Sequence, residues 1–226
     1  MARTEVIVVD DGSDDGTAEV AGSALGHLRR AEVVRVAHRG KGAAVREGVR
    51  RARGDAIVFT DADMASDPRD LSRLVAGLDA ADVAIGSRAI EGSSTSHAPF
   101  SRVVMGRAFN RLVRAATGLS WRDTQCGFKA FRASAGKRLF ELSTIDGFAF
   151  DVEILTLADR LGYRVVEVPV QWTGVGGSHV RPLVDSARMV AGVARSARHA
   201  RHLPAPALAP APEGALVAPV LPPSRA

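Results

Sequence analysis

The segment Val6-Ile-Val-Val-Asp-Asp-Gly-Ser-Asp-Asp-Gly-Thr17 indicates the fold class of this chain. It begins with a short apolar run of mostly β-branched residues and ends in two carboxylates and a glycine turn. Such a run is typical of a strand buried on both faces of a parallel sheet. Similar runs follow at 33–36, 56–60 and 83–85, separated by helical patterns. The alternation predicts a doubly wound, mostly parallel α/β sheet, whose ligands bind at the carboxyl ends of the strands.

Further elements are expected beyond this first region. A glycine- and serine-rich loop at 91–97 precedes a helix that starts near Pro99, and a second helix covers 151–161. The segment 163–172 reads as an edge strand, because Pro169 cannot donate to a ladder. We expect one domain over 1–183, a basic amphipathic helix over 184–202, and a disordered Pro/Ala-rich tail over 203–226.

Composition narrows the class of protein. The chain has 226 residues, of which 46% are hydrophobic and 24% charged, and this excludes a wholly disordered protein. No apolar run approaches the roughly 20 residues needed to cross a bilayer, and the N-terminus gives no sign of a secretory signal. The single cysteine, Cys126, cannot form an internal disulfide, which fits a reducing compartment. We therefore expect a cytoplasmic location.

The positive charge is concentrated near the C-terminus. Residues 186–202 contain four arginines and no acid, and without those arginines the formal net charge falls from +5 to +1. The arginines alternate there with apolar residues, which include Met189, Val190 and Val193. This pattern predicts a helix lying on an anionic membrane at its inner face, and the alternative is a solvated basic helix. Binding to nucleic acid is disfavoured, because the chain has few aromatic residues and its excess positive charge lies at one end.

Two acidic pairs follow predicted strands. Asp10 and Asp11 end the first strand, where a ligand role competes with capping of the next helix by Ser13 or Asp14. Asp61 and Asp63 follow the strand 56–60. In an extended segment the side chains of residues two positions apart point the same way, so both carboxylates are expected to face one cavity. Carboxylate oxygens suit Mg²⁺ or Mn²⁺, which bind through one or two carboxylates plus substrate phosphates.

A glycine-rich loop opens the next predicted helix. The motif Arg39-Gly-Lys-Gly42 follows the second strand, and a helix N-terminus with a lysine attracts phosphate. A plain glycine turn explains the motif equally well, and the spacing is not that of a Walker A loop.

Seven motifs in unbroken order then carry a resemblance. They are VIVVDDGSDDGT, RGKGAAVREGVRRARGD, FTDADMASDP, AIGSR, DTQCGFKAFR, GFAFDVEIL and EVPVQW. The series, from about Glu5 to Gly192, resembles family 2 glycosyltransferases of the GT-A fold. It is most similar to the dolichyl- and polyprenyl-phosphate glucosyltransferase and mannosyltransferase branch. The resemblance divides 1–183 into a donor half, about 1–90, and an acceptor half, about 91–183.

The resemblance also implies roles for individual residues. The donor-binding set is Asp10, Asp11, Gly40, Lys41, Gly42, Asp61 and Gln125. The metal ligands are Asp61 and Asp63. The catalytic set is Asp63, Arg88, Arg102, Asp123 and Lys129, in which Arg88 and Arg102 hold phosphate and Asp123 and Lys129 belong to the acceptor-side motif.

The implied reaction is an inverting transfer of a hexose from UDP-glucose or GDP-mannose to a polyprenyl phosphate. The departing diphosphate needs a metal ion and cationic side chains to neutralise it. A phosphate monoester has a second pKa of about 6, so the acceptor oxygen is already ionised and needs no strong base. Arg88, Arg102 and Lys129 are then expected to aim the acceptor phosphate, and Asp123 to be an orienting group rather than a base.

One departure from the family pattern sets the competing hypotheses. Family members begin with a further strand and helix, carrying a motif like P-x-Y-N-E, and that strand lies between the strands at Val6 and Ile57. Without it, two strands are expected to carry unpaired backbone groups, each costing about 1–3 kcal/mol. A misassigned start or fragment, a strand from another polypeptide, or closure of the two strands would explain this. The alternatives to a transferase are a non-catalytic nucleotide-sugar-binding scaffold and a nucleotidyltransferase.

Overall fold

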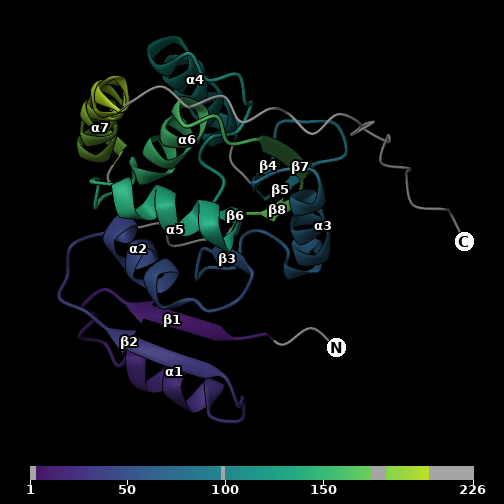
Figure 1. The fold of residues 1–226 in the computed structure, drawn as a ribbon, viewed down its shortest axis with the longest axis vertical. Helices are drawn as coiled ribbons and strands as arrows, with labels where there is room; N and C mark the ends of the chain where they lie inside the picture. The colour runs from purple at the N-terminus through teal and green to yellow at the C-terminus, as the bar shows by residue number, and fades with distance from the viewer. Residues whose placement is uncertain (1–3, 98–99, 175–181, 204–226) are drawn as a thin grey trace, which may run out of the picture.

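The computed structural model describes residues 4–97, 100–174 and 182–203 (Figure 1). The strands are β1 (Val6–Asp10), β2 (Ala31–Arg35), β3 (Ala56–Thr60), β4 (Val83–Ser87), β5 (Ser94–Ser96), β6 (Phe128–Arg132), β7 (Val165–Pro169) and β8 (Gln171–Thr173). The α-helices are α1 (Thr17–Leu25), α2 (Lys41–Arg51), α3 (Leu71–Ala76), α4 (Phe100–Thr117), α5 (Ala133–Leu142), α6 (Phe150–Arg160) and α7 (Pro182–His202). Short 3₁₀ turns at Pro68–Asp70 and Gly77–Asp79 flank α3.

The main sheet has the order β3-β6-β4-β7. Strand β6 runs antiparallel to both β3 and β4, whereas β4 and β7 are parallel, so β3, β4 and β7 share one direction. Strand β4 is buried at all five positions because it lies inside the sheet. Strand β7 lies at an edge, which confirms the interpretation of Pro169. The predicted segment 163–172 is not one strand, however, because Gln171–Thr173 forms β8 and pairs with β5 in a separate sheet.

A second sheet is formed by β1 and β2 alone. These strands pair in parallel, from Val6 opposite Ala31 to Asp10 opposite Arg35. Among the described residues no strand pairs with the other edge of β1 or with the outer edge of β3, so the predicted interruption is present. The two strands have not closed up. The carboxylate of Glu5 partly bridges the division, because it accepts hydrogen bonds from the backbone N–H groups of Arg53 and Gly54.

Helices α5 and α6 pack on one face of the main sheet, and α2 packs against both of them and against β1 (Figure 1). The largest core cluster joins side chains of β3, β4 and β6 to Leu139, Phe140, Phe150 and Ile154 of the covering helices. Helix α6 is buried at nine consecutive positions, 150–158, and two of these are acids, Asp151 and Glu153. Buried acids need partners, and these partners place α6 at the candidate site.

The structure corrects several expectations about local elements. The predicted strands at the starts of the donor motifs are present, but β6 and α5 were not predicted as elements. The predicted loop at 91–97 contains β5, which pairs with β8. The helix after β1 begins at Thr17 with Gly16 as its N-cap, and neither Ser13 nor Asp14 caps it.

Helix α7 packs against α6 and α4 at the end of the molecule away from the β1–β2 sheet (Figure 1). Its buried side contains Gly192, Val193, Ser196 and Ala200. Val193 is only 4% exposed and joins a core cluster with Val113 and Val152, so its predicted place on a membrane-facing side was wrong. No helix in the described part of the chain is long and apolar enough to span a bilayer. The predicted tail lies, after Leu203, outside the described residues.

Candidate active site

The turn after β1 separates the two acids of the first pair. Asp10 is 3% exposed, accepts a hydrogen bond from the backbone N–H of Ser13 and lies 3.3 Å from Nε of Arg35. The hydrogen bonds from Ser13 hold the pKa of Asp10 below its ordinary value. Asp10 therefore shapes the turn, whereas Asp11 faces the neighbouring loop.

Asp11 organises the glycine-rich loop before α2. Its two carboxylate oxygens accept hydrogen bonds from the backbone N–H groups of Arg39 (2.9 Å) and Gly40 (2.8 Å). Gly40 has a φ of +124°, and an added Cβ would lie 2.6 Å from the carbonyl oxygen of Asp146. Only glycine suits this conformation and this close approach. The loop is thus fixed between Asp11 on one side and residue 146 on the other.

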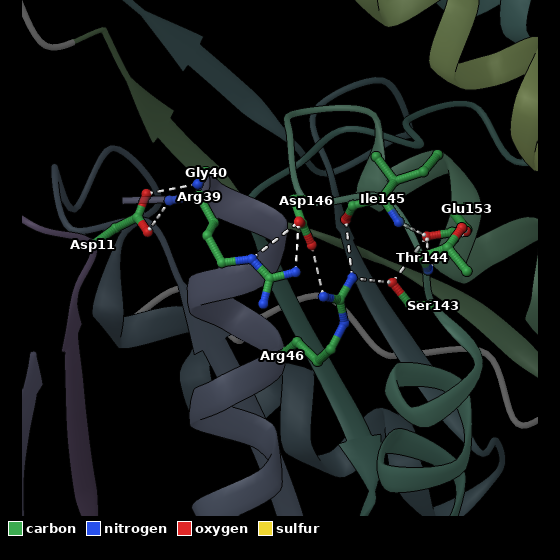
Figure 2. Close-up of polar contacts among 9 residues, drawn as sticks. All are labelled: Asp11, Arg39, Gly40, Arg46, Ser143, Thr144, Ile145, Asp146 and Glu153. Carbon is green, nitrogen blue, oxygen red and sulfur yellow. Dashed lines mark hydrogen bonds and ion pairs between the residues drawn. The ribbon is translucent and has the colours of Figure 1, made fainter. Parts of the chain in front are cut away.

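Figure 2 shows how the opposite side of this loop is held. The carboxylate of Asp146 accepts hydrogen bonds from the guanidinium groups of Arg39 (2.8 Å) and Arg46 (2.7 Å). Burial raises the pKa of Asp146, but the two arginines lower it by a larger amount, so the pKa of this carboxyl lies below its ordinary value. Buried Glu153 accepts from Ser143, Thr144 and Ile145 and so anchors the segment that carries Asp146.

Asp61 and Asp63 lie in a turn rather than in the extended segment that the sequence suggested. The backbone N–H of Met64 bonds to the carbonyl of Asp61, and Met64 has a φ of +52°. The carboxylate of Asp61 lies over Gly127, where an added Cβ would be 2.0 Å from its Oδ2. Asp63 is exposed and accepts a hydrogen bond from the N–H of Ala65.

Lys41, the first residue of α2, connects these acids to the glycine-rich loop. Its Nζ lies 2.6 Å from Oδ1 of Asp61 and 4.0 Å from Oδ2 of Asp151. Burial lowers the pKa of Lys41, but Asp151, Asp61 and Asp63 together raise it above its ordinary value. Both acids of the Asp-Ala-Asp turn therefore act on one ammonium group. Through Lys41 and Gly40 the ends of β1 and β3 meet at a single site.

The residues of the turn fit a hard divalent cation. Asp63 offers exposed and Asp61 partly exposed carboxylate oxygens, which are the ligands that Mg²⁺ and Mn²⁺ prefer. Within the described residues no group of three or more His, Cys, Asp or Glu side chains is arranged to hold a metal. A site with two carboxylates matches the way in which Mg²⁺ completes its shell with waters and substrate phosphates.

On the other side of β6, Arg88 and Asp123 form a nearly buried ion pair. Asp123 accepts hydrogen bonds from Nε, Nη2 and the backbone N–H of Arg88, at 2.7, 3.0 and 3.0 Å. Burial raises the pKa of Asp123, but Arg88 lowers it by a larger amount, so the pKa of this carboxyl lies below its ordinary value. The Arg88 side chain is 33% exposed, and its guanidinium lies 5.6 Å from the ring centroid of Trp172. Asp123 thus fixes the orientation of the Arg88 guanidinium, and a carboxyl with a lowered pKa is a poor base.

Lys129 lies in the interior rather than on an acceptor surface. It is 0% exposed, and its Nζ donates to Oδ1 of Asp151 (2.5 Å) and to the carbonyl of Cys126 (2.6 Å). The arrangement does not support the predicted contact between Lys129 and an acceptor phosphate, because Asp151 already neutralises this charge. Cys126 is 1% exposed and belongs to a core cluster with Phe128 and Ala130.

The remaining predicted residues are placed less closely. Gln125 is half-buried, and its backbone N–H donates to Asp123 at 3.3 Å. Gly42 lies in the first turn of α2, where an added Cβ would meet the carbonyl of Ile145 at 2.4 Å. Arg102 lies in α4, but its side chain is outside the described residues, so its predicted role stays a prediction.

The architecture matches solved structures of one class. Glucosyl-3-phosphoglycerate synthase from Mycobacterium tuberculosis in complex with UDP superposes with a TM-score of 0.62 at 21% identity, covering 85% of this chain and 68% of that one. The same enzyme in complex with Mn²⁺ and UDP-glucose gives a TM-score of 0.61 at 22% identity, covering 85% and 67%. The chain thus has an α/β fold of the GT-A type, with acids at the ends of its strands.

The sequence comparisons identify the family. The profile of glycosyl transferase family 2 matches residues 2–140, and the chain belongs to that family. Dolichyl-phosphate beta-glucosyltransferase of Drosophila melanogaster is 41% identical over 192 residues, covering 79% of this chain and 58% of that protein. The human protein of the same name is 37% identical over 189 residues with the same coverage. The chain therefore spans less than two thirds of the length of these relatives.

Three residues at the site carried no predicted role. Asp146, Asp151 and Glu153 lie in or just before the motif GFAFDVEIL, which was recognised only as a family signature. A signal was present, since acids within an apolar helical run need cationic or N–H partners. Their partners, however, come from segments as far as 107 residues away.

Proposed function

We propose that this chain is the catalytic domain of an inverting, metal-dependent glycosyltransferase that moves glucose from UDP-glucose to a polyprenyl phosphate of the dolichyl type. The observation that carries the proposal is that Asp11 fixes the backbone of Gly40 while the next residue, Lys41, pairs with Asp61, so that acids from the ends of β1 and β3 meet at one site. Support for the donor and acceptor comes from the names of the relatives and from the UDP-glucose complex of the structural neighbour.

The donor would lie against the glycine-rich loop and the Asp-Ala-Asp turn. Asp61 and Asp63 would hold Mg²⁺ or Mn²⁺, which when bound neutralises the charge of the departing diphosphate. Lys41 adds a cation at the N-terminal end of α2, whose dipole also favours a negative group. Asp11 supports this end indirectly, because it fixes the backbone of Arg39 and Gly40.

The acceptor phosphate would meet Arg88. An ionised phosphate oxygen forms a bond to the anomeric carbon while the bond from that carbon to the diphosphate oxygen breaks, and the configuration inverts. The phosphate needs aim rather than deprotonation. Arg88 is suited to orient the phosphate, because Asp123 holds its Nε and Nη2 while a third of the side chain stays exposed.

We also propose that the outer side of α7 rests on an anionic membrane at the cytoplasmic face. Val190 is 45% exposed, and Arg195, Arg198 and Arg201 are exposed on the same helix. Helix α4 packs against α7 and exposes Arg111, Leu112 and Arg114. Each arginine near an anionic surface adds about 1 kcal/mol of attraction.

Transfer of labelled glucose from UDP-glucose to polyprenyl phosphate in detergent, with Mn²⁺ or Mg²⁺, tests the proposal. GDP-mannose in place of UDP-glucose tests the donor. We expect transfer that requires the metal and that falls at least about 100-fold in Asp63→Ala, while Asp79→Ala, an exposed acid outside the site, keeps it. Equal transfer by Asp63→Ala would refute the metal role.

A second candidate is a non-catalytic protein that binds nucleotide sugars, favoured by the open edges of β1 and β3. It predicts saturable binding of UDP-glucose with Mn²⁺ but no transfer. Pyrophosphate release from a nucleoside triphosphate would instead indicate a nucleotidyltransferase.

A further inference from the structure

The ammonium group of Lys41 is paired with the carboxylate of Asp61, which a divalent cation would need as a ligand. Its Nζ is 2.6 Å from Oδ1 of Asp61, and the side chains are only 26% and 37% exposed. The same Nζ lies 5.7 Å from the centroid of the Phe150 ring, so its position is limited from a second side. A metal bound to Asp61 would face this charge at close range, and like charges so near repel strongly in a partly buried site.

A second acceptor for Lys41 lies within reach. Oδ2 of Asp151 is 4.0 Å from Nζ, while the other oxygen of Asp151 bonds to Lys129. Asp151 is buried in α6, so its position does not depend on solvent or on a ligand. A small rotation of the flexible lysine side chain would move Nζ from Asp61 to Asp151, and α2 would not have to move.

We propose that Lys41 is the resident counter-ion of Asp61, and that Asp151 receives it when a divalent cation binds. The inference rests on the proposed function only in taking Asp61 as a metal ligand. Asp151 is in this scheme a positioning residue, because it acts on the metal site through Lys41. The exchange keeps the site electrically balanced both with and without the metal. It also leaves the lysine beside the metal, where the diphosphate of a donor would bind.

The test is a titration with Mn²⁺ alone, in which the free ion is followed by electron paramagnetic resonance. Lys41→Met removes the competing charge and should bind Mn²⁺ about 3- to 10-fold more tightly than the parent chain. Lys41→Arg keeps a cation and should bind like the parent. The matched control is Lys137→Met, an exposed lysine of α5, which should also leave the affinity unchanged.

Asp151→Asn removes the charge that receives Lys41 and should weaken Mn²⁺ binding about 3-fold. Its control is Asp159→Asn, an exposed acid of the same helix. Should Asp151→Asn fail to fold because Lys129 loses its partner, Lys129→Met/Asp151→Asn carries no unpaired interior charge and should show the same weaker binding.

Unchanged or weaker Mn²⁺ binding by Lys41→Met overturns the counter-ion role. Unchanged binding by both Asp151 variants overturns the role of Asp151, and tight binding by Lys41→Arg overturns the explanation by charge. These titrations contain no sugar nucleotide or lipid. A chain that responds as expected but transfers no glucose would therefore refute the proposed function and leave the exchange standing.

Discussion

The two sides of the candidate site hold their charges in different ways. On the proposed donor side, Asp61 and Lys41 are 37% and 26% exposed, and Asp63 lies at the surface. On the acceptor side, the carboxylates of Asp123 and Asp151 are 9% and 5% exposed, and each is already paired with a cation. One side keeps its charges near water, and the other keeps them inside the fold.

The difference follows from the cost of removing charge from water. An exposed carboxylate can change partners cheaply, because water compensates for the partner it loses. A buried pair cannot, because breaking it leaves an unpaired charge in a medium of low polarity. The donor side is therefore suited to ions and diphosphates that come and go. The acceptor side is suited to holding one fixed arrangement.

The strongest test of this contrast is Lys129→Met. The substitution leaves Asp151 without its buried partner, and we expect the free energy of unfolding to fall by about 3–5 kcal/mol. Urea denaturation measures this loss, and Lys137→Met on the exposed side of α5 should change it by less than about 0.5 kcal/mol.

The double variant Lys129→Met/Asp151→Leu separates a broken pair from a lost lysine. Replacement of both charges by apolar groups is often close to neutral, so most of the lost stability should return. A double variant as unstable as Lys129→Met would show that the pair is not what stabilises this region.

The sequence was sufficient to predict strands β1 to β4 of the proposed donor half, but not the turn that holds Asp61 and Asp63. Short apolar runs ending in acids predicted β1, β3 and the acids that follow them, because burial of a parallel strand leaves a local signature. The same reasoning explained Pro169 at the edge of the sheet. Where a structural signal is carried by a residue and its near neighbours, it can be read without the fold.

Strand β6 and helix α5, in the proposed acceptor half, carried no such signature. Strand β6 reads Phe-Lys-Ala-Phe-Arg, and a lysine in a central buried strand makes sense only when Asp151, 22 residues later, is known to neutralise it. The pairs that Asp146 forms with Arg39 and Arg46 join segments about 100 residues apart. Such partners are fixed by tertiary packing, and pattern analysis of one sequence does not reveal them.

Arg88→Lys probes the acceptor side with the charge retained. Lysine cannot reproduce the two hydrogen bonds from Nε and Nη2 to Asp123, so we expect the free energy of unfolding to fall by about 1–3 kcal/mol. The KM for polyprenyl phosphate should rise about 10-fold while Mn²⁺ affinity stays unchanged. Arg69→Lys is the matched control, because Arg69 binds Asp67 through the same two nitrogens but is 89% exposed. If both variants lose the same stability, burial is not what distinguishes the two pairs.

Gly127→Ala probes the donor side without removing a charge. The new Cβ would lie 2.0 Å from Oδ2 and 2.3 Å from Cγ of Asp61, so the Asp61 side chain must move to another rotamer, which a short, partly exposed side chain does at little cost. We expect Mn²⁺ affinity to fall about 10-fold, equivalent to 1.4 kcal/mol, with the free energy of unfolding changed by less than about 1 kcal/mol. Gly147→Ala is the control, because nothing lies within 4 Å of its added Cβ. A large loss of stability with unchanged Mn²⁺ binding would contradict the exchangeable character of this side.

Acid titration of stability gives the smallest expected effect. Arg88 holds the pKa of Asp123 below its ordinary value, so this carboxyl binds its proton more readily in the unfolded chain than in the folded one. Its contribution to stability is complete above the unfolded pKa of about 3.9 and is lost as the pH falls through the lower folded pKa. The free energy of unfolding of the parent chain should therefore fall more steeply below about pH 4 than that of Asp123→Asn, which has no proton to take up at this position. Asp79→Asn, at an exposed position, should keep the slope of the parent. Parallel curves for the parent and Asp123→Asn would mean that Asp123 is hydrated in the folded chain, and the contrast between the two sides of the site would then fail at this residue.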